Sequence, residues 1–461
     1  MKKTIILVAL SAMLGSCGIY KKYERPADMA TDSIFGTQYQ TADTSSLASL
    51  GWKELFTDPH LQALIDTALV RNTDLRTAQL RVEQALVGLR IARLDYLPSL
   101  NLVPDGAVSS FDNYDHVKTG TNWTYNIAAA ASWELEIFGK KTNAKRQAKA
   151  QAQMAKDYQQ AVRTGLIAGV ATQYYTLLML DEQQRIAQST SEKFRESVRV
   201  MRAMMAAGMA NEVAVSQLEG AWYQVEAAVQ DISRSIAELE NSLSTTLCEA
   251  PHPILRGRLA DARFPETLKT GIPIALLSRR PDVRAAENNL AASYYAVNVA
   301  RASLYPSLSL SGVAGWTNNL GGTVVEPAGL LLNAAGSLFQ PIFNATALKG
   351  KVQIAKAEQQ VATLAFQQTV LNAGAEVNNA LTRYQTAARK ESWRTRQVAS
   401  LTNAVAKTEK LMQHTSTTYL EVLTAQQSLL QAETAQAQDT YEKISAVVEL
   451  YRALGGGQED E

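Results

Sequence analysis

The chain has 461 residues, more than one ordinary core requires, and its 45 Lys and Arg against 44 Asp and Glu give a net charge of +1. Such a balance gives no reason to expect a nucleic-acid binder. Hydrophobic residues make up 46% and charged residues 19%, which excludes a disordered or collagen-like chain. Two Cys residues cannot form a disulfide framework, so a small disulfide-stapled fold is excluded as well. Runs of Ala, Gln, Leu and Glu are instead typical of long helices.

The N-terminus has the pattern of an export signal. Lys2 and Lys3 precede an apolar run over 4–13, and small residues then lead to Cys17, so we expect residues 1–16 to be a signal peptide. The ending Leu14-Gly15-Ser16-Cys17 resembles the bacterial lipobox, which implies a diacylated Cys17 at the start of a lipid-anchored extension over 17–59. Gly18 after it favours the outer membrane by resemblance to lipoprotein sorting rules. The alternative is an ordinary signal peptide with an incidental Cys.

An internal duplication organises the rest of the chain. The segment from Asp74 to Leu100 recurs from Asp282 to Leu308, 208 positions later, and the segment from Tyr125 to Phe138 recurs from Leu330 to Phe343, 205 positions later. A third correspondence, at an offset of 207, relates the residues around Gly208 to those around Thr415. We therefore predict two similar repeats. Their bounds are 60–247 and 268–454, with a linker at 248–267 and a tail at 455–461.

Each repeat is predicted to contain a helix, two strands, a very long helix, a turn and a further helix. Residues 61–95 show apolar positions at helical spacing, ended by the Leu97-Pro98 step. Residues 141–207 contain no Pro, so a helix of about 100 Å is expected there. The predicted strands are 98–112, 122–137, 304–317 and 328–343, and the predicted long helices are 141–207, 210–246, 347–413 and 418–453.

The predicted strands alternate between apolar and polar residues. No later segment has the ~18 consecutive apolar residues of a membrane-spanning helix, so any further crossing of a membrane must use strands. A two-residue alternation is typical of a sheet with hydrocarbon on one side and water on the other, although soluble sheets show it too. The residues expected to face lipid are Tyr125, Ile127, Trp133, Leu308, Leu310 and Trp316.

The strand count favours an assembly of three chains. Four strands per chain leave open edges, which lipid does not tolerate. Eight strands would leave an interior filled by side chains, whereas three chains supply twelve strands and an aqueous bore. We therefore expect a homotrimer with a 12-stranded β-barrel and a hollow cylinder of helices continuing the bore.

Several motifs resemble the TolC-like outer membrane efflux factors, and within them the lipoproteins that serve resistance-nodulation-division drug pumps. They are the Cys17 lipobox, Arg-Pro-Asp-Val-Arg at 280–284, Tyr-Pro-Ser-Leu at 305–308, Phe-Gln-Pro-Ile-Phe at 339–343 and Tyr-Leu-Glu-Val-Leu-Thr-Ala-Gln at 419–426. The resemblance covers essentially the whole mature chain. It implies a mixed α/β membrane protein, a trimeric β-barrel on a long periplasmic α-barrel, that docks with a periplasmic adaptor and an inner-membrane pump.

The helix turns near 207–212 and 414–419 are expected to be the periplasmic tips. Candidate adaptor-docking residues there are Gly208, Met209, Asn211, Thr415, Thr418 and Tyr419. Glu421 is the main candidate for a pore or gate residue and Glu212 the weaker one, because threefold symmetry would gather three carboxylates near the axis. The alternative is a solvated Glu on an exposed helix face. Thr415 stands where the family often has Gly, which leaves the geometry of the second turn open.

No catalytic function, cofactor or metal centre is expected. The four His residues show no ligand spacing and no phosphate-binding loop appears. Met201, Met204, Met205 and Met209 share one helix face, where thioethers can bind Cu(I) but more often pack against neighbours. Cys248 is expected to be a small buried residue. We therefore predict a passive outer membrane duct for drugs or other small toxic compounds. Alternatives are a duct for metal ions or type I protein secretion, and a periplasmic coiled-coil adaptor or scaffold without a barrel.

Overall fold

The computed structural model describes residues 20–25, 51–112, 118–264, 280–318, 329–342, 345–413 and 418–456. Cys17 and Thr415 lie outside the described residues, as does the predicted signal peptide. The chain forms two compact units. The strand unit comprises residues 1–27, 81–156 and 285–367, and the helical unit comprises residues 28–80, 157–284 and 368–461.

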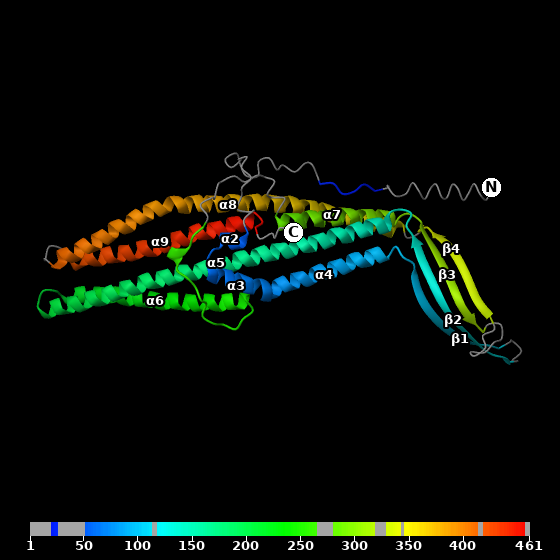
Figure 1. Cartoon of the computed structure of the whole chain (residues 1–461), viewed down its shortest axis with the longest axis horizontal. Helices are drawn as coiled ribbons and strands as arrows, with labels where there is room; N and C mark the ends of the chain where they lie inside the picture. Colours follow the sequence, from blue (N-terminus) through cyan, green and yellow to red (C-terminus); the bar gives the residue numbers. More distant parts are fainter. Residues whose placement is uncertain are drawn as a thin grey trace. The chain divides into compact units, whose positions relative to one another are not determined.

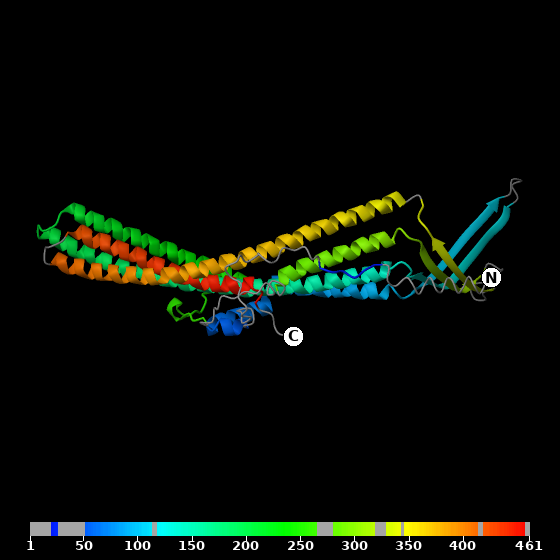
Figure 2. The ribbon, with the colours of Figure 1, turned by 90° about the horizontal axis from the view of Figure 1, so that it is seen from above.

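The strand unit is built around one antiparallel sheet whose strands lie in the order β1-β2-β3-β4 (Figure 1). Its strands are β1 (Ser99–Asp112), β2 (Lys118–Leu135), β3 (Ser307–Thr317) and β4 (Gly329–Phe339). Four helices lead into or out of these strands and contribute residues to both units (Figures 1 and 2). They are α4 (Thr73–Leu94), α5 (Lys140–Ala206), α7 (Pro281–Ala302) and α8 (Ala345–Gln413). The predicted combination of long helices with four strands per chain is thereby confirmed.

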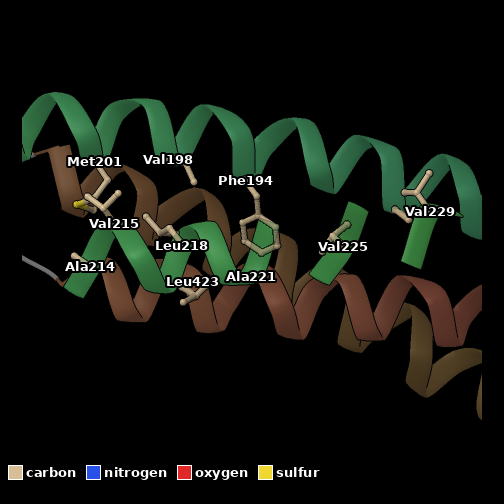
Figure 3. Packing of buried hydrophobic residues seen from close by; sticks show 11 residues of the cluster. Phe194, Val198, Met201, Ala214, Val215, Leu218, Ala221, Val225, Val229 and Leu423 are labelled. Atoms are coloured by element: carbon tan, nitrogen blue, oxygen red, sulfur yellow. The ribbon is translucent and has the colours of Figure 1, made fainter. Parts of the chain in front are cut away.

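The helical unit packs around apolar side chains from α5, α6 (Glu212–Thr246) and α9 (Tyr419–Ala453). Phe194 and Val198 of α5 meet Leu218 of α6, and Leu423 enters from α9 (Figure 3). These positions recur at three- and four-residue spacing, so each helix buries one stripe against the others. The unit also holds the short α2 (Trp52–Leu55), α3 (Pro59–Arg71) and a 3₁₀ turn at Leu259–Asp261. Within the described residues, no helix is both long and apolar enough to cross a bilayer.

The first helix predicted for repeat one is divided in the structure. The expected continuous helix over 61–95 is instead α3 and α4, separated at Asn72. The Asn72 Oδ1 atom accepts hydrogen bonds from the backbone N–H groups of Asp74 and Leu75, at 3.0 and 3.1 Å, and so caps α4. Its amide also donates to the Thr246 carbonyl at 2.9 Å. A capping Asn satisfies the free amides of a new helix start, which overrides the apolar periodicity.

Where the structure describes the residues after a helix, three helices end in a Schellman motif. At the end of α5 the Gly208 N–H bonds to the Met205 carbonyl, and Gly208 has a positive φ of 74°. Gly455 occupies the same position after α9, with φ 76°. After α6 the position is held by Cys248, with φ 57° and bonds from Cys248 N–H to Thr245 and from Glu249 N–H to Ser244. The expected burial of Cys248 is therefore wrong, because its thiol is exposed at a helix terminus.

Replacing Cys248 by Gly should stabilise the fold. We expect the free energy of unfolding to increase by about 0.5–1 kcal/mol. Gly relieves roughly 1–2 kcal/mol of strain that a side chain causes in the left-handed conformation. This gain exceeds the roughly 0.4–1 kcal/mol by which the greater entropy of Gly stabilises the unfolded chain. Thermal unfolding of the purified protein in detergent measures the change. Cys248→Ser, which keeps a side chain, is the control and should unfold at the same temperature as the wild-type protein. A Gly variant no more stable than the Ser variant would contradict the prediction.

Candidate functional site

The pairing register sorts the sheet into an apolar face and a polar face. Directly opposed residues in antiparallel strands share a face. Ile127 of β2 is opposite Pro104 and Trp316, and Trp133 is opposite Leu310. The apolar face therefore consists of Leu100, Leu102, Pro104, Gly106, Val108, Trp123, Tyr125, Ile127, Ala129, Ala131, Trp133, Leu135, Leu308, Leu310, Gly312, Ala314, Trp316, Leu330, Leu332, Ala334, Gly336 and Leu338. All six residues that the sequence predicted to face lipid lie on it.

The other face is rich in polar groups. Asn126 donates to the Asp105 carboxylate across the β1–β2 pair at 3.1 Å, and Ser309 and Ser337 hydrogen-bond across β3–β4 at 2.7 Å. Glu134 is opposite Ser309, and Ser132 is opposite Ser311. Two chemically different faces on one sheet suit a boundary between hydrocarbon and water.

Large side chains on the apolar face are open to the surroundings in the single chain. Trp316 is 55% exposed, Ile127 and Leu310 are each 41% exposed, and Trp133 is 38% exposed. Tyr125 and Leu308 are half-buried. A contiguous exposed apolar surface marks contact with lipid or a partner. The aromatic residues Trp123 and Trp133 lie toward opposite ends of β2, as in the aromatic girdles of membrane barrels.

The first predicted tip is a tight connection between α5 and α6. Gly208 makes the turn, and Asn211 caps α6 by accepting a hydrogen bond from the Ala214 N–H at 3.0 Å. Met209 at the turn is 63% exposed. Met201 of the same stripe is only 3% exposed and belongs to the apolar cluster in Figure 3, so at this position the stripe serves packing.

The second predicted tip spans residues 414–419, of which the structure describes Thr418, the N-cap position of α9, and Tyr419, its first helical residue. The Tyr419 hydroxyl donates to the side-chain carbonyl of Gln217 on α6, which links the two tip helices. No sequence pattern pointed to Gln217, because a polar residue on an exposed helix face is unremarkable. The structure thus brings Tyr419 into one contact with α6.

Glu212 is the first residue of α6 and Glu421 the third residue of α9. Each is exposed and lies in the first turn, of α6 and α9 respectively, where a negative charge interacts favourably with the helix dipole. The repeat counterpart of Glu421 is Ala214, which is 2% exposed and packs in the apolar cluster. An acidic ring at this level would therefore have three members in a trimer.

Comparison with known proteins decides the family. The family model described as "Outer membrane efflux protein" matches residues 64–248 and again residues 272–456. The chain belongs to this family. It is 29% identical over 450 residues to the cation efflux system protein CusC of Escherichia coli, covering 96% of this chain and 97% of CusC. It is likewise 29% identical over 472 residues to the toluene efflux pump outer membrane protein TtgC of Pseudomonas putida, covering 99% and 96%.

Solved structures agree with the fold. The outer-membrane channel OprN superposes with a TM-score of 0.87 at 27% identity, over 96% of this chain and 99% of OprN. Members of the outer membrane efflux protein family are trimeric channels, so the predicted fold class is confirmed. The protein is a homotrimeric exit duct in the outer membrane that extends into the periplasm. It works with a periplasmic adaptor and an inner-membrane resistance-nodulation-division pump, as the sequence predicted.

The Arg-Pro-Asp-Val-Arg motif of the efflux protein has a structural role. Arg280 is 5% exposed and its guanidinium pairs with Asp282 at 2.7 Å and Glu376 at 2.8 Å, while also donating to the Ala453 carbonyl. Burial alone would raise the pKa of Asp282, but the hydrogen bonds from Arg280 outweigh it and hold that pKa below its usual range. The motif thus ties the start of α7 to α8 and to the end of α9.

Charged side chains also join α8 to α9 farther along. Asp439 has a side chain only 6% exposed and pairs with Lys390 at 2.7 Å and Arg394 at 2.8 Å. Burial pushes the pKa of Asp439 up, and the two cations more than reverse the shift, so its pKa lies below the usual value. Sequence reasoning missed this group, because charges on long helices are ordinary. Among the described residues, no cluster of three or more His, Cys, Asp or Glu side chains is placed to hold a metal ion.

Adjacent alanines on opposite faces of β2 test the assignment of the membrane face. Ala129 lies on the apolar face and Ala130 on the polar face. We expect Ala129→Arg to lose the heat-modifiable trimer in outer membranes, since a cationic side chain near the bilayer midplane costs about 2–4 kcal/mol. Ala130→Arg, the same change one residue on, should assemble. Equal assembly of the two variants would contradict the assignment.

Proposed function

We propose that this duct exports drugs and other small toxic compounds through a water-filled bore lined by the polar face of the sheet. The observation that carries the proposal is the register: one face of all four strands is apolar, and the polar side chains gather on the other. The large apolar residues on that second face are Val103, Val313, Leu331 and Phe339. A wide aqueous bore need not recognise its cargo, so the partner pump selects the compound. The duct itself performs no bond chemistry, and family members are channel proteins.

Metal-ion export is the second candidate. CusC is a cation efflux protein by name and TtgC a toluene efflux protein, and this chain is 29% identical to each, so identity favours neither cargo. Met205 and Met209, exposed by 38% and 63%, present thioethers near the first tip, and such groups bind soft cations. Met201, at the buried end of the same stripe, packs in the core instead.

A lipid anchor on Cys17 fits the place of the residues that follow it. Residues 20–25 lie against α7 within the strand unit: the Tyr23 N–H donates to the Tyr295 hydroxyl, and the Tyr294 hydroxyl donates to the Lys21 carbonyl. Tyr20 packs beside Gly139, where β2 passes into α5. The segment thus reaches the level where strands meet helices only three residues after Cys17. An acyl chain there would enter the inner leaflet of the outer membrane.

The tips are proposed to form the gate, with adaptor docking as the trigger. Gly208, Met209, Asn211, Thr418 and Tyr419 are the proposed docking surface, to which the sequence adds Thr415. Below it, α6 and α9 are held by apolar packing and by the Tyr419–Gln217 hydrogen bond. A partner that binds better when these helices are apart shifts the population toward the open duct. Glu421 and Glu212 are the proposed selectivity residues.

Deletion of the gene tests the cargo. We expect the deletion strain to become more susceptible to a panel of organic solvents and antibiotics, and complementation with the wild-type protein to restore resistance. Copper and silver salts belong in the same panel. Susceptibility confined to the metals would favour the second candidate, and an unchanged panel would contradict both. Complementation with Ala129→Arg is the control for membrane assembly.

Removing the Tyr419 hydroxyl should favour the open gate. Tyr419→Phe keeps the ring packed against the apolar cluster but loses the hydrogen bond to Gln217, which typically contributes about 0.5–1.5 kcal/mol. We therefore expect a higher open probability of single channels in planar bilayers. Gln217→Leu, which removes the other partner, should have the same effect.

Glu421→Gln is the matched variant in that experiment. It removes a charge two residues from Tyr419 while leaving the Tyr419–Gln217 bond in place. Loss of cation selectivity at unchanged open probability would assign selectivity to Glu421. Unchanged selectivity would leave Glu421 as an ordinary surface charge, and an unchanged open probability in Tyr419→Phe would contradict the gate.

A further inference from the structure

The sheet of the strand unit ends in two edges within the described residues. β1 pairs only with β2, and β4 only with β3. Unpaired backbone groups on an edge strand cost several kcal/mol each in hydrocarbon, so both edges need a partner in the membrane. In a homotrimer the occupant of each edge is a second copy of this chain. The alignment of the two strands in that pair is the undetermined quantity.

The chain contains its own template for this pair. The predicted repeats make the β1–β2 hairpin equivalent to the β3–β4 hairpin, with offsets of 208 from β1 to β3 and 205 from β2 to β4. The contact between the two hairpins inside one chain is β2 against β3, where Ser132 is opposite Ser311 and Trp133 is opposite Leu310. The equivalent contact between chains is β4 against β1.

We propose that β4 of one copy pairs with β1 of the next in the register of the β2–β3 contact. Applying the offsets moves Ser132 to Ser337 and Ser311 to Val103, so Ser337 lies opposite Val103 of the second copy. Leu338 then lies opposite Leu102, and Leu332 opposite Val108, of that copy. The contact is heterologous, since different edges meet, and a ring closes it.

The pairing register inside the chain gives an independent check. Leu332, Leu338, Leu102 and Val108 all belong to the apolar face, assigned from the β1–β2, β2–β3 and β3–β4 pairs alone. The proposed register therefore continues the apolar face from one copy to the next. A shift of one residue would set these leucines against polar-face residues.

The helix that precedes β1, α4, also has an apolar surface that a second copy of the chain would cover. Val87, Ile91 and Leu94 of α4 are exposed by 49%, 56% and 54%. Their counterparts in α7 are Tyr295, Val299 and Ala302, none of which is exposed. α7 is covered inside the chain by α5, where Ala150 packs against Ala291 and Ala292 and Arg146 lies 6.0 Å from the Tyr295 ring. The repeat assigns the cover of α4 to α8 of the second copy, since α8 is the counterpart of α5.

Shifts of two residues are the competing registers, because they preserve the faces. One is suggested by the hairpins themselves: the offsets carry the Ser99–Ser132 pair to Ser307–Ser337, whereas Ser307 pairs with Phe339. If that slip also applied to the interface, Ser337 would lie opposite Asp105 rather than Val103. The opposite slip would place it against Asn101. The β2–β3 contact is the better template, because both it and the interface join two hairpins.

Cysteine pairs distinguish the three registers. In full-length Cys248→Ser protein in outer membranes, Ser337→Cys is combined in turn with Asn101→Cys, Val103→Cys or Asp105→Cys and treated with a short thiol-to-thiol crosslinker. Directly opposed Cβ atoms lie about 4.5–5.5 Å apart and diagonal ones about 7–8 Å. We expect covalent dimers and trimers with Val103→Cys and their loss with the other two. Ser132→Cys with Ser311→Cys, the template pair, should bridge within one chain.

Strongest crosslinking at Asn101 or Asp105 would overturn the register, as would no covalent oligomer from any pair when the template pair bridges. Each double variant is first required to form heat-modifiable trimers and to conduct ions without crosslinker. A wrong register in a conducting trimer would sink this inference alone and leave the export function standing. Absence of trimers and conductance in the Cys248→Ser parent would instead contradict the channel.

Discussion

The pairing of backbone groups inside a bilayer is the constraint on which this molecule depends. Hydrocarbon offers no hydrogen-bond partners, so a sheet is stable there only when each of its edge strands pairs with another strand. The described residues of one chain form four strands, and their sheet ends in two edges, β1 and β4. The trimer is therefore part of the fold of the membrane region. The internal repeat serves the same end, because a duplicated hairpin presents to its neighbouring copy nearly the surface that it presents to its own second half.

The two faces of the sheet result from the alternation of apolar and polar residues along each strand, which the pairing register aligns from one strand to the next. Small residues predominate at the centre of β2, where Ala128 to Ala131 run in sequence, and bulky ones lie toward its ends. Ala128 is 5% exposed opposite Gly315, where an added Cβ would come within 2.2 Å of the Ile127 carbonyl oxygen. The tight approach of β2 to β3 thus depends on a Gly. Ala128 and Gly315 lie on the polar face, the same face as the contact between Asn126 and Asp105.

The sequence predicted the repeats of apolar residues well, and single backbone positions poorly. The alternation of apolar and polar residues in the strands and the absence of Pro in the long run after 140 are properties of many residues. One local exception therefore does not change the prediction. Asn72 and Cys248 show the opposite case. Asn72 divides a helix because its side-chain oxygen accepts hydrogen bonds from the first backbone N–H groups of α4. Its side-chain NH₂ group also donates to the Thr246 carbonyl, 174 positions away. Cys248 adopts φ 57° because the end of α6 requires it, although the residue type gives no sign. Likewise the partner of Tyr419, Gln217, comes from another helix.

The kinds of contact along the helical unit differ in a way that suits a gate. Between α8 and α9, directional ion pairs join Asp439 to Lys390 and Arg394, and Arg383 to Glu449, and such pairs fix one helix against the other. Toward the tip, α6 and α9 meet through apolar side chains, whose attraction is not directional, and through the Tyr419–Gln217 bond. The neighbouring helices α5 and α6 are joined by an ion pair as well, between Arg202 and Glu219. Apolar surfaces can slide at small cost as long as they stay covered. Helices held in register by ion pairs and able to shift at the tip would transmit docking into opening without unfolding.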